Sequence, residues 1–103
     1  MTVARAEHFG PGKRKLVFAG DRRIAVFNAG GALHAVDDRC THSGGPVSEG
    51  SCEHGVATCP WHNGRFRLAD GAALGPPVYR ALTVYPVRVT NGMVEVHVPD
   101  DLP

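Results

Sequence analysis

The sequence predicts an all-β fold. Thirteen glycines and eight prolines divide the 103 residues into short segments, which is typical of strands joined by turns. No stretch of about a dozen residues shows the apolar period of an amphipathic helix. The clearest hairpin signal is Asn91-Gly92, which apolar segments flank on both sides. Type I′ turns prefer this pair because both residues tolerate positive φ.

Strands in the first two thirds of the chain are expected over residues 15–19, 23–27, 32–36, 56–58 and 65–68. Gly20-Asp21 separates the first two strands, and the Asn-Ala-Gly-Gly segment over residues 28–31 separates the second from the third. Asp70-Gly71 closes the last pair. These residues are the ones that tight turns use, so each apolar run is expected to end where they begin.

The remaining strands are expected over residues 82–85, 87–89 and 93–98. In the last of them valines alternate with Glu95 and His97, which predicts one buried face and one solvent face. Pro86 cannot donate a hydrogen bond to a β-ladder, so it predicts a sheet edge or a bulge.

The length predicts one domain, residues 1–103, with no separate catalytic domain. A net charge of +1 excludes a nucleic-acid binder that works by bulk electrostatics. The first residues hold no apolar signal segment, and no apolar run approaches the roughly 20 residues that cross a bilayer. Three cysteines, an odd number, do not indicate a disulfide framework. We therefore expect a soluble, cytoplasmic protein with reduced thiols, and no membrane partner.

Two short Cys/His pairs carry the chemistry of the sequence. Cys-Thr-His over residues 40–42 and Cys-Pro-Trp-His over residues 59–62 both stand among glycines and prolines. Two thiolates and two imidazoles suit tetrahedral zinc or an iron–sulfur cluster better than magnesium or calcium. Each pair lies at the ends of predicted strands, so we expect two loops that face each other across a metal. The candidate ligands are Cys40, His42, Cys59 and His62.

Two other interpretations of these residues stay open at this point. The four could be coincidental, although two such pairs in loops of one small chain disfavour this. Structural zinc is the stronger rival. The zinc-finger pattern, however, pairs Cys with Cys and His with His and places the histidines on a helix, and no helix is predicted here.

The sequence resembles the Rieske [2Fe–2S] domain over roughly residues 15–98. The resemblance rests on residues 33–50, on residues 59–66, and on Gly75-Pro76-Pro77, which stands where the family has a proline loop covering the cluster. It implies an antiparallel β-sandwich of small sheets with a two-loop cluster-binding subdomain at about residues 38–70. It also implies a [2Fe–2S] cluster in which Cys40 and Cys59 ligate one iron and His42 and His62 the other.

The sequence departs from the high-potential branch of that family. Respiratory Rieske proteins have an extra cysteine in each motif and two hydroxyl side chains that bond to cluster sulfurs. Here Trp61 stands at one extra-cysteine position, and Gly64 and Phe66 stand at the hydroxyl positions. Without those donors we expect a potential in the lower part of the Rieske range, roughly −150 to 0 mV.

The resemblance implies a one-electron carrier and not an enzyme. The expected role is the ferredoxin of an oxygenase system such as an aromatic-ring-hydroxylating dioxygenase, with a flavin-dependent ferredoxin reductase as donor and a terminal oxygenase as acceptor. A small Rieske subunit of a nitrite-reductase-type enzyme and a zinc-stabilised interaction module are the alternatives. Cys52 is expected to be a free thiol outside the ligand set, and His54 a surface-loop histidine.

Overall fold

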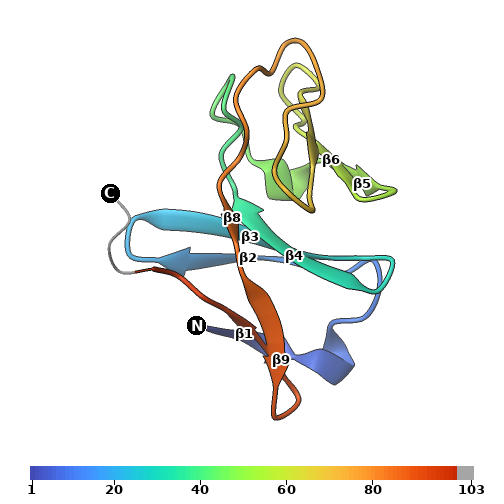
Figure 1. Ribbon diagram of the computed structural model, residues 1–103, viewed down its shortest axis with the longest axis vertical. Coiled ribbons are helices and arrows are strands. Elements are labelled where there is room, and N and C mark those ends of the chain that lie inside the picture. The colour runs from blue at the N-terminus through green and yellow to red at the C-terminus, as the bar shows by residue number, and fades with distance from the viewer. Residues whose placement is uncertain (100–103) are drawn as a thin grey trace.

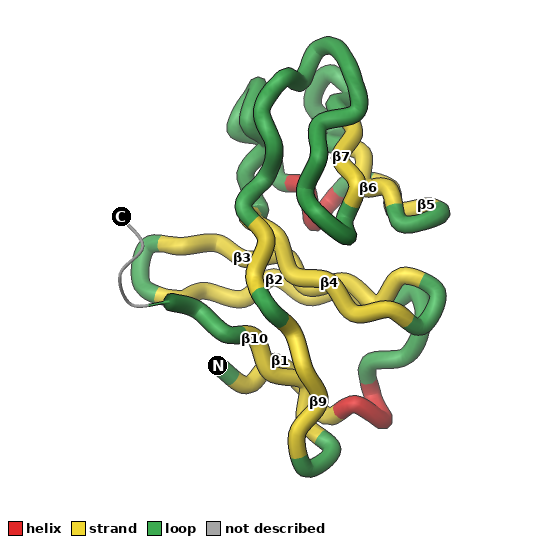
Figure 2. Tube along the Cα trace, in the orientation of Figure 1, coloured by secondary structure: helices red, strands yellow, loops and turns green. Residues whose placement is uncertain are grey.

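The computed structural model describes residues 1–99, which form three small antiparallel sheets (Figures 1 and 2). The strand orders are β1-β10-β9, β2-β3-β4-β8 and β5-β6-β7. The strands are β1 (Thr2–Arg5), β2 (Arg14–Ala19), β3 (Arg22–Ala29), β4 (Ala32–Asp37), β5 (Ser51–Glu53), β6 (Val56–Thr58), β7 (Arg65–Arg67), β8 (Val84–Tyr85), β9 (Val87–Thr90) and β10 (Met93–Val96). Two short 3₁₀ turns cover Ala6–His8 and Val47–Glu49. The predicted all-β fold is confirmed.

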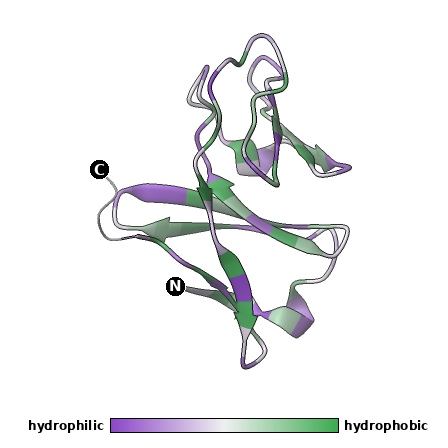
Figure 3. Ribbon diagram, viewed as in Figure 1, coloured by the Kyte–Doolittle hydropathy of each residue, from purple (hydrophilic) through white to green (hydrophobic). Residues whose placement is uncertain are grey.

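The central strand of the middle sheet, β3, supplies two hydrophobic cores because its side chains alternate between the two faces. Ile24 and Val26 enter a lower core with Val94 and Val96 of β10. Ala25 and Phe27 enter an upper core that also contains Cys40 and Cys59, the two candidate thiol ligands. Figure 3 accordingly shows hydrophobic residues both above and below the middle sheet. The central strand β3 is therefore buried on both faces.

The hairpin predicted around Asn91-Gly92 is confirmed. Asn91 has φ of 52° and Gly92 has φ of 74°, and β9 pairs with β10 from Thr90 opposite Met93 onward. Pro86 lies between β8, which pairs with β4, and β9, which pairs with β10. The proline thus marks the point where the chain passes from one sheet to another, since it cannot continue either ladder.

The chain leaves the middle sheet at the end of β4 and returns to it at β8, and residues 38–83 form the upper part of the molecule in Figure 1. The small sheet β5-β6-β7 lies in this part. Arg14 of β2 ties the two parts together: its Nη1 donates to the Ser48 carbonyl at 3.0 Å and to the Gly50 carbonyl. Its guanidinium also lies 5.4 Å from the centre of the Phe27 ring.

Most of the predicted strands are found within one or two residues of their expected bounds, whereas β1 and β5 were not predicted. Among residues 1–99 no helix has the length and apolar character needed to span a membrane.

Candidate metal centre

The first cluster loop begins directly after β4 and closes on itself. The Cys40 N–H donates to the Gly45 carbonyl at 2.9 Å, and the Gly44 N–H donates to the Cys40 carbonyl at 2.8 Å. Gly44 has φ of +76°, a conformation that a glycine adopts without steric cost. This turn keeps Cys40 buried at its base and leaves His42 exposed at its tip.

The second cluster loop connects β6 to β7 and is closed by a bond from the Cys59 N–H to the Gly64 carbonyl at 2.7 Å. Within it His62 and Asn63 both have positive φ, 68° and 59°. Left-handed backbone is uncommon outside glycine and tends to persist where the surrounding structure fixes it, as in ligand clamps. The reversal places His62 at the surface and Cys59 in the core.

The two loops bring the four predicted ligands together as two like pairs. The Cys40 and Cys59 thiols are both buried, with 2% and 0% exposure, in the same hydrophobic core. The His42 and His62 rings are exposed, with their centres 5.7 Å apart and their planes at 78°. Each loop therefore contributes one buried sulfur and one exposed imidazole.

The thiols have different electrostatic surroundings. Burial alone would raise the pKa of Cys40, but hydrogen bonds from the Ser43 and His42 N–H groups outweigh it, and this pKa is lowered. Burial raises the pKa of Cys59, and the neighbouring Cys40 adds to the rise, against a bond from the Trp61 N–H. Amide N–H groups directed at both sulfurs are the contacts that stabilise metal-bound thiolates.

Two glycines in the loops leave room for the sulfurs and for a third loop. A Cβ at Gly45 would lie 2.8 Å from Cys59 Sγ and 2.8 Å from the Trp61 ring. A Cβ at Gly64 would lie 2.6 Å from the Val78 side chain and 3.6 Å from Cys40 Sγ. Any larger residue would push into the sulfur ligands or their cover, so the close approach of the loops requires glycine here.

The segment after the Gly75-Pro76-Pro77 motif covers this region. Val78 is buried in the upper core beside Gly64 and Cys40. The Thr41 hydroxyl donates to the Arg80 carbonyl at 2.7 Å, which joins the first cluster loop to this segment.

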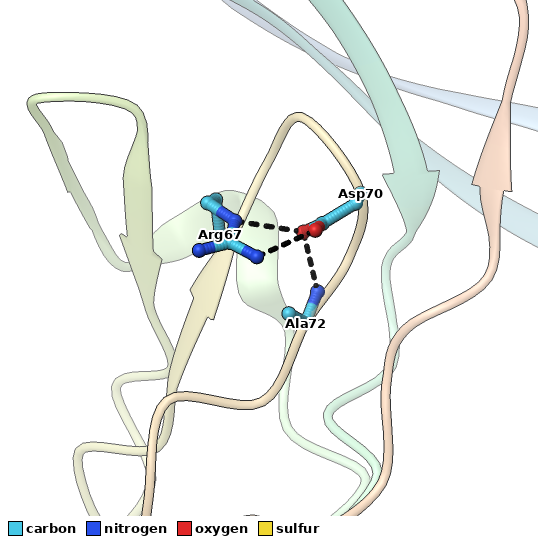
Figure 4. Close-up of polar contacts among 3 residues, drawn as sticks. All are labelled: Arg67, Asp70 and Ala72. Atoms are coloured by element: carbon cyan, nitrogen blue, oxygen red, sulfur yellow. Dashed lines mark hydrogen bonds and ion pairs between the residues drawn. The ribbon is translucent and has the colours of Figure 1, made fainter.

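The turn that leads from β7 into the covering segment is fixed by Asp70. Its carboxylate accepts hydrogen bonds from Arg67 at 3.0 and 2.6 Å and from the Ala72 N–H at 3.0 Å (Figure 4). The bond from Arg67 is the largest cause that lowers the pKa of Asp70 to about 2. Asp70 thus remains a carboxylate at neutral pH and closes the turn.

A hydroxyl group at another position lies close to one of the candidate sulfur ligands. Gly64 and Phe66 indeed offer none, but the Ser43 hydroxyl lies 3.7 Å from Cys59 Sγ. The Gly45 N–H donates to the Ser43 oxygen at 3.3 Å. The sequence could have indicated this contact, because Ser43 directly follows His42. Ser43 does not, however, occupy either of the positions at which the high-potential proteins have their hydroxyl groups.

The residues outside the ligand set take the following places. Cys52 lies in β5, half-buried and without a disulfide, and burial raises its pKa. Trp61 is 52% exposed while one edge of its ring contacts the position of Gly45. Phe66 fills the upper core, and His54 is exposed, as expected.

The donor set fits a two-iron cluster better than a single metal ion. Tetrahedral zinc needs four ligands directed at one point, yet within residues 1–99 no three His, Cys, Asp or Glu side chains are grouped to hold one ion. A buried thiol pair and an exposed imidazole pair instead match the unequal irons of a Rieske cluster.

Comparison with known proteins agrees with this fit. The model of the Rieske [2Fe-2S] domain matches residues 1–86. The anthranilate 1,2-dioxygenase ferredoxin subunit of Burkholderia cepacia is 41% identical over 80 residues, which are 78% of this chain and 74% of that protein.

Two solved structures have the same fold. A chain from the complex of reduced oxygenase and oxidised ferredoxin in carbazole 1,9a-dioxygenase superposes with a TM-score of 0.88 at 33% identity, covering 94% of this chain and all of that one. The Sphingomonas yanoikuyae B1 ferredoxin has a TM-score of 0.87 at 27% identity and covers 96% of this chain and 98% of its own. From the site, the sequence match and the fold together, the chain belongs to the Rieske [2Fe-2S] domain family.

Proposed function

We propose that this chain is a one-electron carrier whose [2Fe–2S] cluster is held by Cys40 and Cys59 on one iron and by His42 and His62 on the other. The observation that carries the proposal is the division of the four side chains into a buried sulfur pair and an exposed imidazole pair. When bound, the cluster takes up and releases single electrons at a potential that its ligands and hydrogen bonds set.

The protein's own groups then have separate tasks. The upper core surrounds the two sulfurs and excludes water from them. The amide groups of His42, Ser43 and Trp61 direct positive dipoles at the thiolates, which favours the more negative, reduced state. The exposed imidazole rings place the metal ligands at the surface, so that an electron crosses to a partner without the partner reaching the buried sulfurs.

The partners are proposed from the named relatives. The anthranilate protein is a dioxygenase ferredoxin subunit, and the carbazole structure contains an oxygenase with a ferredoxin. We infer a flavin-dependent ferredoxin reductase as donor and the terminal oxygenase of an aromatic-ring dioxygenase as acceptor. Exposed Trp61 and Tyr79, of the second cluster loop and the covering segment, supply the aromatic surface that transient docking sites often use.

The same observations weigh on the alternatives. The relatives named as dioxygenase ferredoxin subunits favour a free carrier over a small subunit of a nitrite-reductase-type enzyme. The separate thiol and imidazole pairs disfavour a zinc-stabilised module. None of the three cysteines is in a disulfide, and thiols that stay reduced to hold a cluster suit a reducing compartment, which supports a cytoplasmic location.

Two measurements of electron transfer test this proposal, the first on the purified protein alone and the second with its proposed partners. Protein purified aerobically should be red-brown, should accept one electron per chain in an anaerobic titration, and should then show the EPR signal typical of a reduced Rieske cluster. Mixed with NADH, a flavin-dependent ferredoxin reductase and a terminal dioxygenase, it should be reduced and reoxidised during turnover. A colourless protein that contains stoichiometric zinc would exclude the proposal.

A further inference from the structure

A cleft of about 370 Å³ lies beside the candidate metal centre. Residues of the first cluster loop, among them Cys40 and Thr41, line it together with residues 80–83. The Thr41 hydroxyl joins the two walls through its 2.7 Å bond to the Arg80 carbonyl. The cleft is therefore held in shape by the fold, and a ligand residue of the proposed cluster forms part of its wall.

Two arginines give the cleft a positive charge. Arg39 and Arg80 line it, both are exposed, and neither forms an ion pair with any group in residues 1–99. The one acidic residue in the lining is Asp37, which is half-buried and accepts a hydrogen bond from the Tyr85 hydroxyl at 2.9 Å. The lining thus contains two exposed guanidinium groups and only one carboxylate, which already accepts a hydrogen bond.

Two acidic groups outside the cleft lining, Asp38 and Asp70, do not cancel this charge. Asp38 is buried, with Arg23 at 3.7 Å, and Asp70 is paired with Arg67 at 2.6 Å. The whole chain has a net charge of only +1. The positive charge is therefore a local property of the surface around this cleft and does not follow from the overall composition.

We propose that this cleft is the docking surface for a redox partner protein that presents carboxylates around its own electron-transfer centre. The proposal rests on the function proposed above and adds the chemistry of the partner's surface. A carrier must bind quickly and dissociate quickly, and complementary charge raises the association rate more than the affinity. Because Thr41 lines the cleft and directly precedes the exposed His42, a partner attracted by Arg39 and Arg80 would lie next to an exposed imidazole of the metal centre.

A defined anionic surface tests this without knowledge of the partner. The cluster-loaded protein is studied by voltammetry on gold coated with a carboxylate-terminated monolayer. The test variant is Arg39→Glu/Arg80→Glu, and the matched control is Arg5→Glu/Arg88→Glu, which makes the same change in net charge on β1 and β9. We expect the interfacial electron-transfer rate to fall about tenfold in the test variant and to stay within about twofold of wild type in the control.

Equal losses in both variants would show a response to net charge alone and would overturn the proposal, as would unchanged rates in both. The same variants are then compared with the reductase and the oxygenase that support turnover. For one of these proteins kcat/KM should fall in the test variant at low salt and recover relative to wild type at high salt. An intact EPR signal and one-electron titration in every variant separate a failure of the cleft from a failure of the proposed function.

Discussion

The Ser43 hydroxyl should raise the reduction potential of the cluster, and Ser43→Ala should lower it. The Ser43 oxygen lies 3.7 Å from Cys59 Sγ and accepts a bond from the Gly45 N–H. The Ser43 oxygen accepts the Gly45 N–H through a lone pair, so the hydroxyl hydrogen is still available to donate to Cys59 Sγ. A metal-bound thiolate carries no proton, so Ser43 must be the donor. The bond strengthens when the cluster gains an electron, and therefore it stabilises the reduced state.

The size of the effect follows from the length and type of the bond. A hydrogen bond to a charged acceptor is worth about 1.5–3 kcal/mol. The sulfur accepts this hydrogen bond in both oxidation states of the cluster, and the bond is long. We therefore assign roughly a third of that value, about 0.5–1 kcal/mol, to the difference in bond strength between the reduced and the oxidised state. A one-electron couple shifts by about 59 mV for a tenfold change in equilibrium constant. Loss of the hydroxyl should therefore lower the potential by about 20–45 mV.

Protein-film voltammetry at neutral pH measures the shift directly. Ser43→Thr keeps a hydroxyl and should stay close to wild type. Thr41→Val is the control from the same loop, because the Thr41 hydroxyl bonds to the Arg80 carbonyl and not to a sulfur. If Ser43→Ala moves the potential no more than Thr41→Val does, or moves it upward, the assignment of the donor is wrong.

Four further variants test the site and the link between the two parts of the fold. His62→Ala should abolish the visible absorbance and the EPR signal, because cluster binding and folding are coupled, whereas Cys52→Ser should retain both. Gly45→Ala should reduce the iron content of the purified protein, since the new Cβ would lie 2.8 Å from Cys59 Sγ. Arg14→Ala should lower the free energy of unfolding in urea by about 1–2 kcal/mol through loss of two bonds to backbone carbonyls, and an unchanged midpoint would refute that link.

The sequence was sufficient for elements whose signal is local. The strands of the middle sheet and the β9–β10 hairpin are bounded by glycine, asparagine and aspartate at the turns. The apolar pattern of each strand and the turn residues at its ends therefore indicate the same bounds. Of the two strands it missed, the first depends on a distant partner. Thr2–Arg5 is a strand because it pairs with β10, whose residues lie about ninety positions later. Ser51–Glu53 is three residues long and is defined by its ladder with β6.

The candidate ligands could likewise be predicted, but their arrangement could not. Residue types and spacing indicate two sulfurs and two imidazoles, and nothing local says which pair is buried. That division comes from the left-handed backbone at His62 and from the closed turn after Cys40. The Ser43 contact with Cys59 joins two loops, so it depends on how closely the loops approach, and Gly45 permits that approach only through tertiary packing.

The two cores on either side of β3 differ in whether they contain candidate cluster ligands. The lower core packs strand against strand, with Val94 and Val96 of the C-terminal hairpin, and needs no metal to be complete. The upper core counts the thiols of Cys40 and Cys59 among its buried side chains, so the residues that would hold the cluster also fill the hydrophobic interior. Alternate side chains of β3 enter both cores. The strand that packs in the core with the candidate sulfur ligands is therefore also held by a core that contains none of them.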